Sequence, residues 1–268
     1  MASSTRRPHR GRHVAVLALA LAATLTGCGG AQDAPSAATG AQDTRSPAPA
    51  TTQARPGSTA AGAKASVSAS DPVSAQLPGL GPRTLAEIPE NARQVVVVTG
   101  AGRNSPRSQV VLYQRTPTGW EPGATWPAHN ALKGWTDNHH LNDLRSPIGV
   151  FALTDAGGRL ADPGTELPYD QSQSFTIGGT GFEGEPLAGS FDYVVAINYN
   201  RKAGASPLDW TRPLGAEKGG GIWLHVDHSG PTHGCVSLLR NHIRELLRAL
   251  DPDQHPVIVM GDAQSLGR

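Results

Sequence analysis

The sequence has very little cysteine. Only Cys28 and Cys235 occur among 268 residues, whereas exported proteins that use cysteine structurally usually contain it in pairs. Charged residues make up 17% of the chain and the formal net charge is +1, so we expect no nucleic acid among the partners. The longest apolar run, Val14–Leu25, is too short to span a bilayer comfortably as a permanent helix.

The N-terminal residues have the layout of an export signal. The basic residues that precede the apolar run are Arg6, Arg7, Arg10 and Arg12. After the run, Leu25-Thr26-Gly27-Cys28 resembles the bacterial lipobox, in which the cysteine becomes the lipidated first residue of the mature protein. This resemblance implies a lipoprotein signal peptide over residues 1–28, lipidation at Cys28 and a membrane partner through the lipid anchor. The protein would be exported, attached to the outer face of the cytoplasmic membrane and active in the cell wall; an ordinary secretory signal is the alternative.

Residues 29–83 are predicted to be a low-complexity disordered tether. Much of this segment is Ala, Ser, Thr, Pro, Gly and Gln, with few large apolar residues, so it buries too little surface to offset chain entropy. If Cys28 is lipidated, Cys235 is the one remaining thiol. A lone thiol in an oxidising compartment favours a catalytic role.

Residues 84–268 are predicted to form one mostly β domain with a packed C-terminal helix. Short runs rich in β-branched and aromatic residues, bounded by Gly, Pro, Asn and Asp, predict the strands. These runs are 95–99, 109–114, 148–153, 191–198, 222–226 and 257–260. The helix is expected over residues 238–250, with Ser237 as its N-cap and Asp251-Pro252 after it. The apolar residues of its expected buried face are Leu239, Ile243, Leu246, Leu247 and Leu250.

The segment His225–Ser237 contains the residue types that a thiol acyl-transfer enzyme needs. Cys235 supplies a strong nucleophile, an upstream histidine can take and return its proton, and Gly234 allows backbone N–H groups to approach an oxyanion closely. We therefore expect the Cys235 thiol to ionise below the ordinary value of about 8.5.

Two other interpretations of local motifs are weaker. Val95–Gly102 begins like a dinucleotide-binding fingerprint, but Ser105-Pro106 stands where the helix should start, and the segment is better explained as a β-hairpin. A zinc site at His225, His228, His233 and Cys235 lacks the usual ligand spacing, and a continuing strand would turn His225 and His228 to opposite faces. We expect no metal and no cofactor, and adjacent His139-His140 are expected to be solvated.

The sequence Thr232-His233-Gly234-Cys235, with an upstream histidine on a strand, resembles the YkuD-type L,D-transpeptidase catalytic domain. Ser146–Phe151 is similar to that family's TPxGxF strand, and residues 191–200 and 219–225 are similar to its two core strands before the nucleophile. The resemblance covers about residues 90 to 262. It implies a β-sandwich or barrel-like catalytic domain, in a divergent branch of the family.

The resemblance also implies a mechanism and its residues. Cys235 would attack the third residue of a peptidoglycan stem peptide, and the thioester would pass to another stem in a 3→3 cross-link. His225 would act as general base and acid, oriented by Asp227 as a weaker inference. Backbone N–H groups at Gly234 and Cys235 would stabilise the oxyanion, with Thr232, His233 and Ser237 shaping the loop. Carbapenem-type inhibitors are expected to acylate the thiol.

Two departures from the family pattern leave alternatives open. The gap between His225 and Thr232 is short, and Ser237 stands where the family usually has Asn. A carboxypeptidase or endopeptidase would use the same Cys235, and a non-catalytic wall-binding lipoprotein would need no activated thiol. His225 alone could also be an ordinary strand histidine. The segment 201–219 is either a lid over the substrate or a surface excursion.

Overall fold

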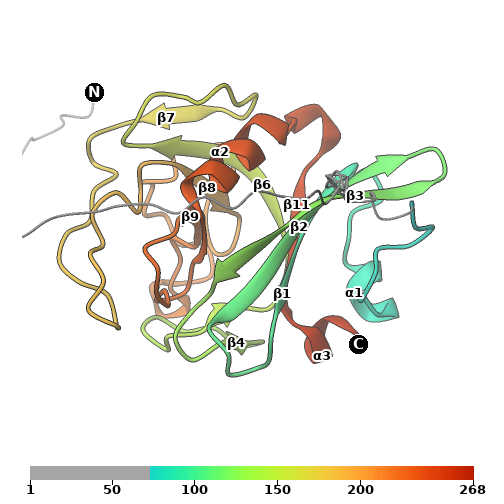
Figure 1. The fold of residues 1–268 in the computed structure, drawn as a ribbon, viewed down its shortest axis with the longest axis horizontal. Helices are drawn as coiled ribbons and strands as arrows, with labels where there is room; N and C mark the ends of the chain where they lie inside the picture. Colours follow the sequence, from blue (N-terminus) through green and yellow to red (C-terminus); the bar gives the residue numbers. More distant parts are fainter. Residues whose placement is uncertain (1–72) are drawn as a thin grey trace, which may run out of the picture. The chain divides into compact units, whose positions relative to one another are not determined.

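The computed structural model describes residues 73–268, in which β-strands predominate (Figure 1). The first half contains α1 (Pro82–Ala86), β1 (Gln94–Gly100), β2 (Arg107–Thr116), β3 (Gly119–His129), β4 (Trp135–Thr136), β5 (Ser146–Pro147) and β6 (Gly149–Gly158). The second half contains β7 (Tyr169–Gln171), β8 (Val194–Ile197), β9 (Trp223–Val226), β10 (Val236–Leu238), α2 (Arg240–Ala249), β11 (Val257–Asp262) and α3 (Ala263–Leu266). Short 3₁₀ turns occupy Ala216–Lys218 and Pro252–Gln254.

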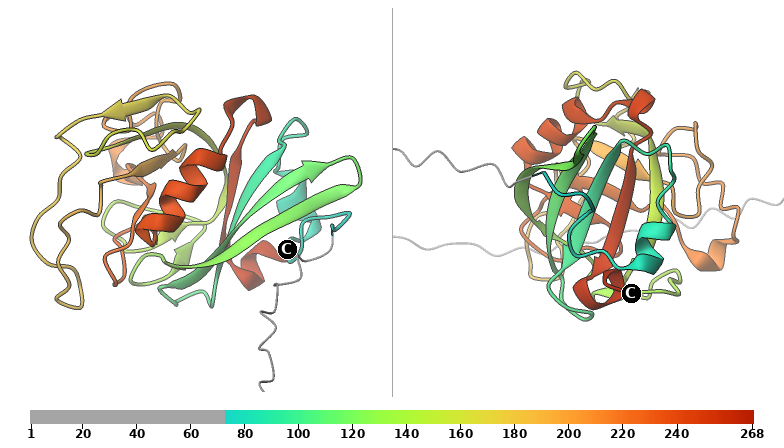
Figure 2. Two further views of the ribbon diagram at one scale, coloured as in Figure 1. Left: turned by 45° about the horizontal axis from the view of Figure 1, so that its top comes forward. Right: turned by 90° about the vertical axis from the view of Figure 1, so that its right-hand side faces the viewer.

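The main sheet closes into a ring. Its strand order is β11-β1-β2-β3-β10-β9-β8-β6-β7, and β11 also pairs with β6. Eight strands therefore form a closed barrel, to which β7 is added beside β6. The expected mostly β, barrel-like fold is confirmed, and so is the packed helix: α2 lies beside β9 and buries Ile243, Leu246 and Leu247 in the main core (Figures 1 and 2).

The run of four valines in β1 is buried on both faces. Val96 and Val98 point into the main core, and Val95 and Val97 belong to a second apolar cluster with Leu77 and Trp120. A strand covered on both sides needs such a continuous apolar run. The turn to β2 makes the hairpin that was expected over the glycine-rich segment, with Val98 opposite Val110.

The packed domain begins earlier than residue 84. Leu77 is 3% exposed, and Ser74 exchanges backbone hydrogen bonds with Trp120 of β3. The expected tether boundary is therefore wrong at its C-terminal end. The error arises because one buried leucine in a small-residue segment gives no periodic signal, although it completes the second core.

Strand β3 was not predicted, because it contains Pro122 and Pro127. Proline removes a ladder donor and is tolerated in strands at bulges and unpaired edges. The register between β2 and β3 shifts near Pro122, and β10 pairs only with Ala128 and His129, beyond Pro127. Both prolines thus lie where the sheet does not need their N–H groups.

Candidate active site and the adjoining pocket

Pairing of β9 with β10 brings the candidate nucleophile and the candidate base to one face. Ser237 lies opposite His225 in the parallel ladder, so Cys235 lies next to Trp223 on the same side. Leu224 and Val226 point into the main core, whereas Trp223 and Cys235 belong to a third apolar cluster outside the barrel. Cys235 and His225 therefore share the outer face, with their Cα atoms roughly 8 Å apart by strand geometry.

Backbone groups hold the thiol. The Trp223 N–H donates to Cys235 Sγ at 3.4 Å, and the thiol donates to the Gly221 carbonyl at 3.6 Å. Gly219, Gly220 and Gly221 all have positive φ angles, which favour glycine, and they deliver this carbonyl to the sulfur. Within the described residues, the thiol makes no hydrogen bond to an imidazole.

Burial keeps both groups neutral in this conformation. It raises the pKa of Cys235 to about 11, which the Trp223 N–H offsets only in part. It also lowers the pKa of His225 to about 4, against the hydrogen bond to Val226. The expectation of a thiol pKa below 8.5 is therefore wrong for this conformation, because no cation among residues 73–268 lies against the sulfur to oppose its desolvation.

His225 is enclosed by aromatic side chains. It is 3% exposed, and Phe191 meets its ring edge-on with centroids 5.4 Å apart. The Nδ1–H donates to the Val226 carbonyl at 2.9 Å, which leaves Nε2 as the basic nitrogen of the neutral ring. The His228 ring stacks on that of His225 with centroids 5.9 Å apart. β9 ends at Val226, so the continuing strand that would have turned the two histidines to opposite faces does not form.

Asp227 does not orient His225 by a hydrogen bond, so that expectation is wrong. Its Oδ1 accepts hydrogen bonds from His129 Nδ1 at 2.8 Å and from Ser237 Oγ at 2.7 Å. The Ser229 N–H donates to Oδ2 at 3.1 Å. Burial disfavours the carboxylate, but His129 and Ser237 outweigh it and lower the pKa of Asp227 to about 2.

Ser237 is not the helix cap. It lies inside β10, and Leu239 is the N-cap of α2, with no side-chain hydrogen bond there. Leu239 is also 47% exposed, so it does not belong to the buried helix face. The strand continues to Leu238 because Ser237 pairs with His225 on one side and with His129 on the other.

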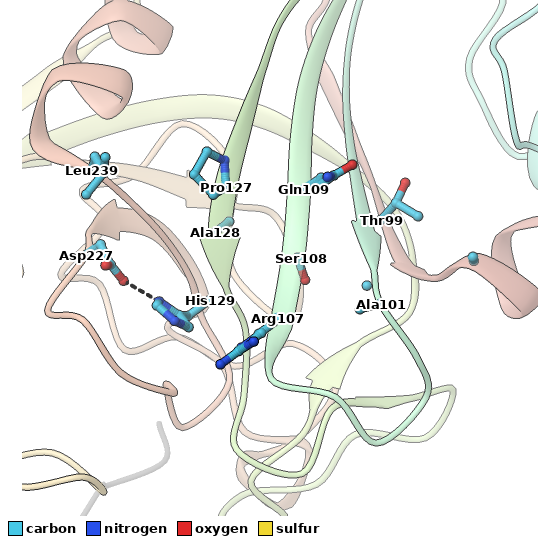
Figure 3. Close-up of a pocket in the computed structure, with 12 residues that line it drawn as sticks. Thr99, Ala101, Arg107, Ser108, Gln109, Pro127, Ala128, His129, Asp227 and Leu239 are labelled. Atoms are coloured by element: carbon cyan, nitrogen blue, oxygen red, sulfur yellow. Dashed lines mark hydrogen bonds and ion pairs between the residues drawn. The ribbon is translucent and has the colours of Figure 1, made fainter.

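The Asp227–His129 pair borders a pocket of about 740 Å³ on the outer face (Figure 3). The hydrogen bond that His129 donates to Asp227 raises the pKa of His129 above its ordinary 6.5, and partial burial opposes this rise. Arg107 pairs with His129 across β2 and β3. The complete lining is Thr99, Gly100, Ala101, Arg107, Ser108, Gln109, Pro127, Ala128, His129, Asp227, Leu239 and Ala263.

Hydrogen bonds and close packing stabilise the turn before the nucleophile. Thr232 Oγ1 donates to the Cys235 carbonyl at 2.6 Å, and the Thr232 N–H donates to Asn130. A Cβ at Gly234 would come within 2.9 Å of Cδ1 of the buried Ile222, so a larger residue here would have to displace that side chain. His233 is exposed, and its ring lies 4.6 Å from that of Phe182.

Several residues near the site were missed or misjudged from the sequence. His139 was expected to be solvated, but it is 6% exposed and packs near Gly219 and Gly234, because the loop folds back under the nucleophile turn. The sequence predicted no role for His129. It also predicted no pairing of His228 with Glu185, whose Nδ1 and Oε1 atoms lie 3.1 Å apart. Only the spatial pairing of distant segments brings these residues together, and no motif spacing indicates it.

The segment 201–219 is a well-anchored loop. Arg201 and Asp155 form a buried ion pair at 2.8 Å, and the Asn200 side chain donates to the Gly215 and Gly219 carbonyls. At its tip, Trp210 is 80% exposed, with the Arg212 guanidinium 4.9 Å from its ring. These anchors favour a fixed wall near Gly220–Gly221 over a loose surface excursion.

The expected signal peptide, Cys28 and most of the tether lie outside the described residues. Among residues 73–268, no helix combines the length and apolar character needed to cross a membrane.

Comparison with family models and with curated proteins gives no match. Among solved structures, Bd1075 of Bdellovibrio bacteriovorus matches with a TM-score of 0.38 and 18% identity. The match covers 68% of this chain and 54% of that chain, so it spans about half of Bd1075.

Proposed function

We propose that the protein is a peptidoglycan L,D-transpeptidase with a YkuD-type domain that acts through a Cys235 thioester. The observation that supports this most directly is the β9–β10 pairing, which places a lone thiol and a histidine on the same outer face. The Gly234 N–H donates to no other group within the described residues, as an oxyanion donor requires before substrate arrives.

In the first step, Cys235 Sγ attacks the carbonyl carbon of the third stem residue. The thiol proton moves to His225 Nε2, and the terminal D-Ala leaves as an amine that takes this proton. In the second step, the side-chain amine of another stem attacks the thioester, which forms a 3→3 amide and restores the thiol. Water in place of the amine gives a shortened stem, which is the carboxypeptidase outcome.

The buried conformation imposes a condition on this chemistry. With thiol and imidazole both held neutral, a preformed thiolate–imidazolium pair is strongly disfavoured. Proton transfer must accompany attack on the carbonyl, or the substrate must displace the groups that cover the pair. Phe191 lies against His225 and belongs to the same apolar cluster as Cys235, so its segment is the one that would move.

The proposal includes attachment to the membrane through lipidated Cys28, with the catalytic domain reaching the wall on its tether. Replacing the lipobox cysteine, Cys28→Ala, is expected to release the protein from the membrane fraction or to block maturation. Fractionation and intact mass check this. Unchanged partitioning with unchanged mature mass would contradict the anchor but leave the enzyme proposal untouched.

The direct test of the enzyme is incubation of the full chain with a disaccharide-tetrapeptide, followed by mass spectrometry. Cross-linked dimers identify a transpeptidase, and shortened stems identify a carboxypeptidase. Cys235→Ala is expected to abolish both products and also any carbapenem adduct. Since Cys235 is partly buried, the unchanged unfolding transition of this variant is the control for folding.

A non-catalytic wall-binding protein is the second candidate. The observation in its favour is that Sγ bonds to backbone groups and has a raised pKa, so the thiol lacks activation in this conformation. Such a protein would bind peptidoglycan, take up no carbapenem and show the same binding after Cys235→Ala.

A further inference from the structure

The pocket beside Asp227 is a site that the thiol chemistry does not use. It lies over the outer face of β1, β2 and β3, and the segments after β9 and β10 complete it. Cys235 is not among its lining residues. Its volume of about 740 Å³ falls within the range of roughly 300–1,000 Å³ that is typical of small-ligand sites.

One end of the pocket presents an oriented imidazole. His129 uses Nδ1 to bond Asp227, and its Nε2 has no partner within the described residues. Asp227 is itself held by Ser237 and the Ser229 N–H, so its position is determined from three sides. A carboxylate fixed in this way favours the protonated imidazole and leaves its second N–H for a ligand.

Arg107 supplies a second donor group at the same end. It lies opposite His129 in the β2–β3 ladder, and Figure 3 shows the two side chains next to each other. Its guanidinium makes no hydrogen bond or ion pair to any residue of the described part of the chain, unlike that of Arg103, which pairs with Asp137 at 3.2 Å. Arginine forms bidentate hydrogen bonds to carboxylates.

The rest of the lining is mainly small and apolar. Figure 3 places Pro127, Ala128 and Leu239 on the side away from Arg107. The 47% exposure of Leu239 is unusual for a leucine beside a helix that is otherwise well packed. The pocket therefore combines cationic donors at one end with an uncharged wall suited to short aliphatic groups.

We propose that this pocket binds the C-terminal end of a peptide with small side chains, its free carboxylate held by His129 and Arg107. The volume accommodates more than one residue, which favours a peptide over a free amino acid. The inference does not rest on the activity of Cys235, because the pocket contains its own binding groups.

Charge determines how binding should vary with pH. Asp227 and the more distant Glu183 favour the protonated form of His129, and Arg107 disfavours it. As the pH rises through the pKa of His129, one cationic donor is lost while Arg107 remains charged. Binding of a carboxylate should therefore weaken at high pH without disappearing.

The test is titration of the full chain with N-acetyl-Ala-Ala-Ala at pH 6, followed by NMR of the histidine side-chain nitrogens. The His129 signals are expected to shift on binding. The same peptide with a C-terminal amide should bind at least tenfold more weakly. Arg107→Gln should weaken binding of the acid by about tenfold, the size of one charge-assisted hydrogen bond, and His129→Gln should do the same.

Arg93→Gln, at a residue outside the pocket, is the matched control and should leave affinity unchanged. The proposal is overturned if the amide binds as well as the acid. It is also overturned if Arg107→Gln has the affinity of the parent chain, or if His129 does not respond to saturating acid. Arg107 is exposed, so its variant is expected to fold even if His129→Gln does not.

Discussion

His225 and His129 lie on one outer face of the barrel, separated by Ser237. Their environments shift their pKa values in opposite directions. Burial lowers the pKa of His225 to about 4, whereas a bonded carboxylate raises that of His129. His225 is 3% exposed as a residue, and the side chain of His129 is 30% exposed at a pocket. Burial thus keeps His225 neutral, whereas the carboxylate of Asp227 favours the protonated form of His129.

The largest effect that separates the two histidines should appear in acylation. His225→Ala is expected to slow carbapenem acylation of Cys235 by roughly 10²–10⁴-fold, the usual contribution of a general base. His129→Ala should leave the rate within a few-fold of the parent. Intact-protein mass measured against time checks both variants. Equal slowing by the two substitutions would show that the histidines do not have separate roles.

Direct titration should sharpen the contrast. Nitrogen NMR of the histidine rings should show His225 neutral down to about pH 4 and His129 still protonated above pH 6.5. Overlapping midpoints for His225 and His129 would contradict the assignment of the two environments.

Removing the carboxylate should affect stability. Asp227→Asn is expected to lower the free energy of unfolding at pH 6 by about 1–3 kcal/mol, as for the loss of a charge-assisted hydrogen-bond set. Asp227 has a lowered pKa, so its contribution is present above pH 3.8 and is lost as the pH falls towards about 2. His129 has a raised pKa, so its contribution is complete below pH 6.5 and is lost as the pH rises through the folded value.

Denaturant unfolding of parent and variant between pH 2 and pH 9 measures this dependence. The difference between the two proteins should be largest from about pH 4 to 6.5. A difference that does not vary with pH would mean that Asp227 acts by packing alone.

The smallest effect is expected at Ser237. Ser237→Ala removes one of three donors to Asp227 and should cost about 0.5–1.5 kcal/mol of stability. The pKa of His129 should change little, because its own bond to Asp227 remains. Acylation of Cys235 should keep the parent rate. A large loss of acylation would instead link Ser237 to the nucleophile.

The sequence predicted the parts of this molecule that depend on local pattern. The valine run of β1 and the leucine-rich face of α2 both follow hydrophobic periodicity, and the structure confirms both. Cys235 and His225 were recognised from one short segment and do lie on one face. Their ionisation was not predictable, since desolvation depends on Phe191 and Trp223, which pack around them only after folding.

The role of Asp227 shows most clearly what the sequence alone could not predict. Its two-residue spacing from His225 suggested a pair, and the two residues do belong to the same side of the chain. The carboxylate nevertheless bonds His129, which is 98 positions away in the sequence. Only the antiparallel pairing of β3 with β10 creates that neighbour, and β3 was hidden by its two prolines.

Closure of the barrel has a consequence for how the domain forms. The ring is completed by β11, which pairs in parallel with β1 and antiparallel with β6. The first and last strands of the ring are thus partners, and loop closure over so long a segment is slow. During synthesis, the edges of β1 and β6 that pair with β11 would stay unpaired until residue 262 has left the ribosome. A chain cut before β11 should therefore remain open, exposing the valine run of β1 to other chains.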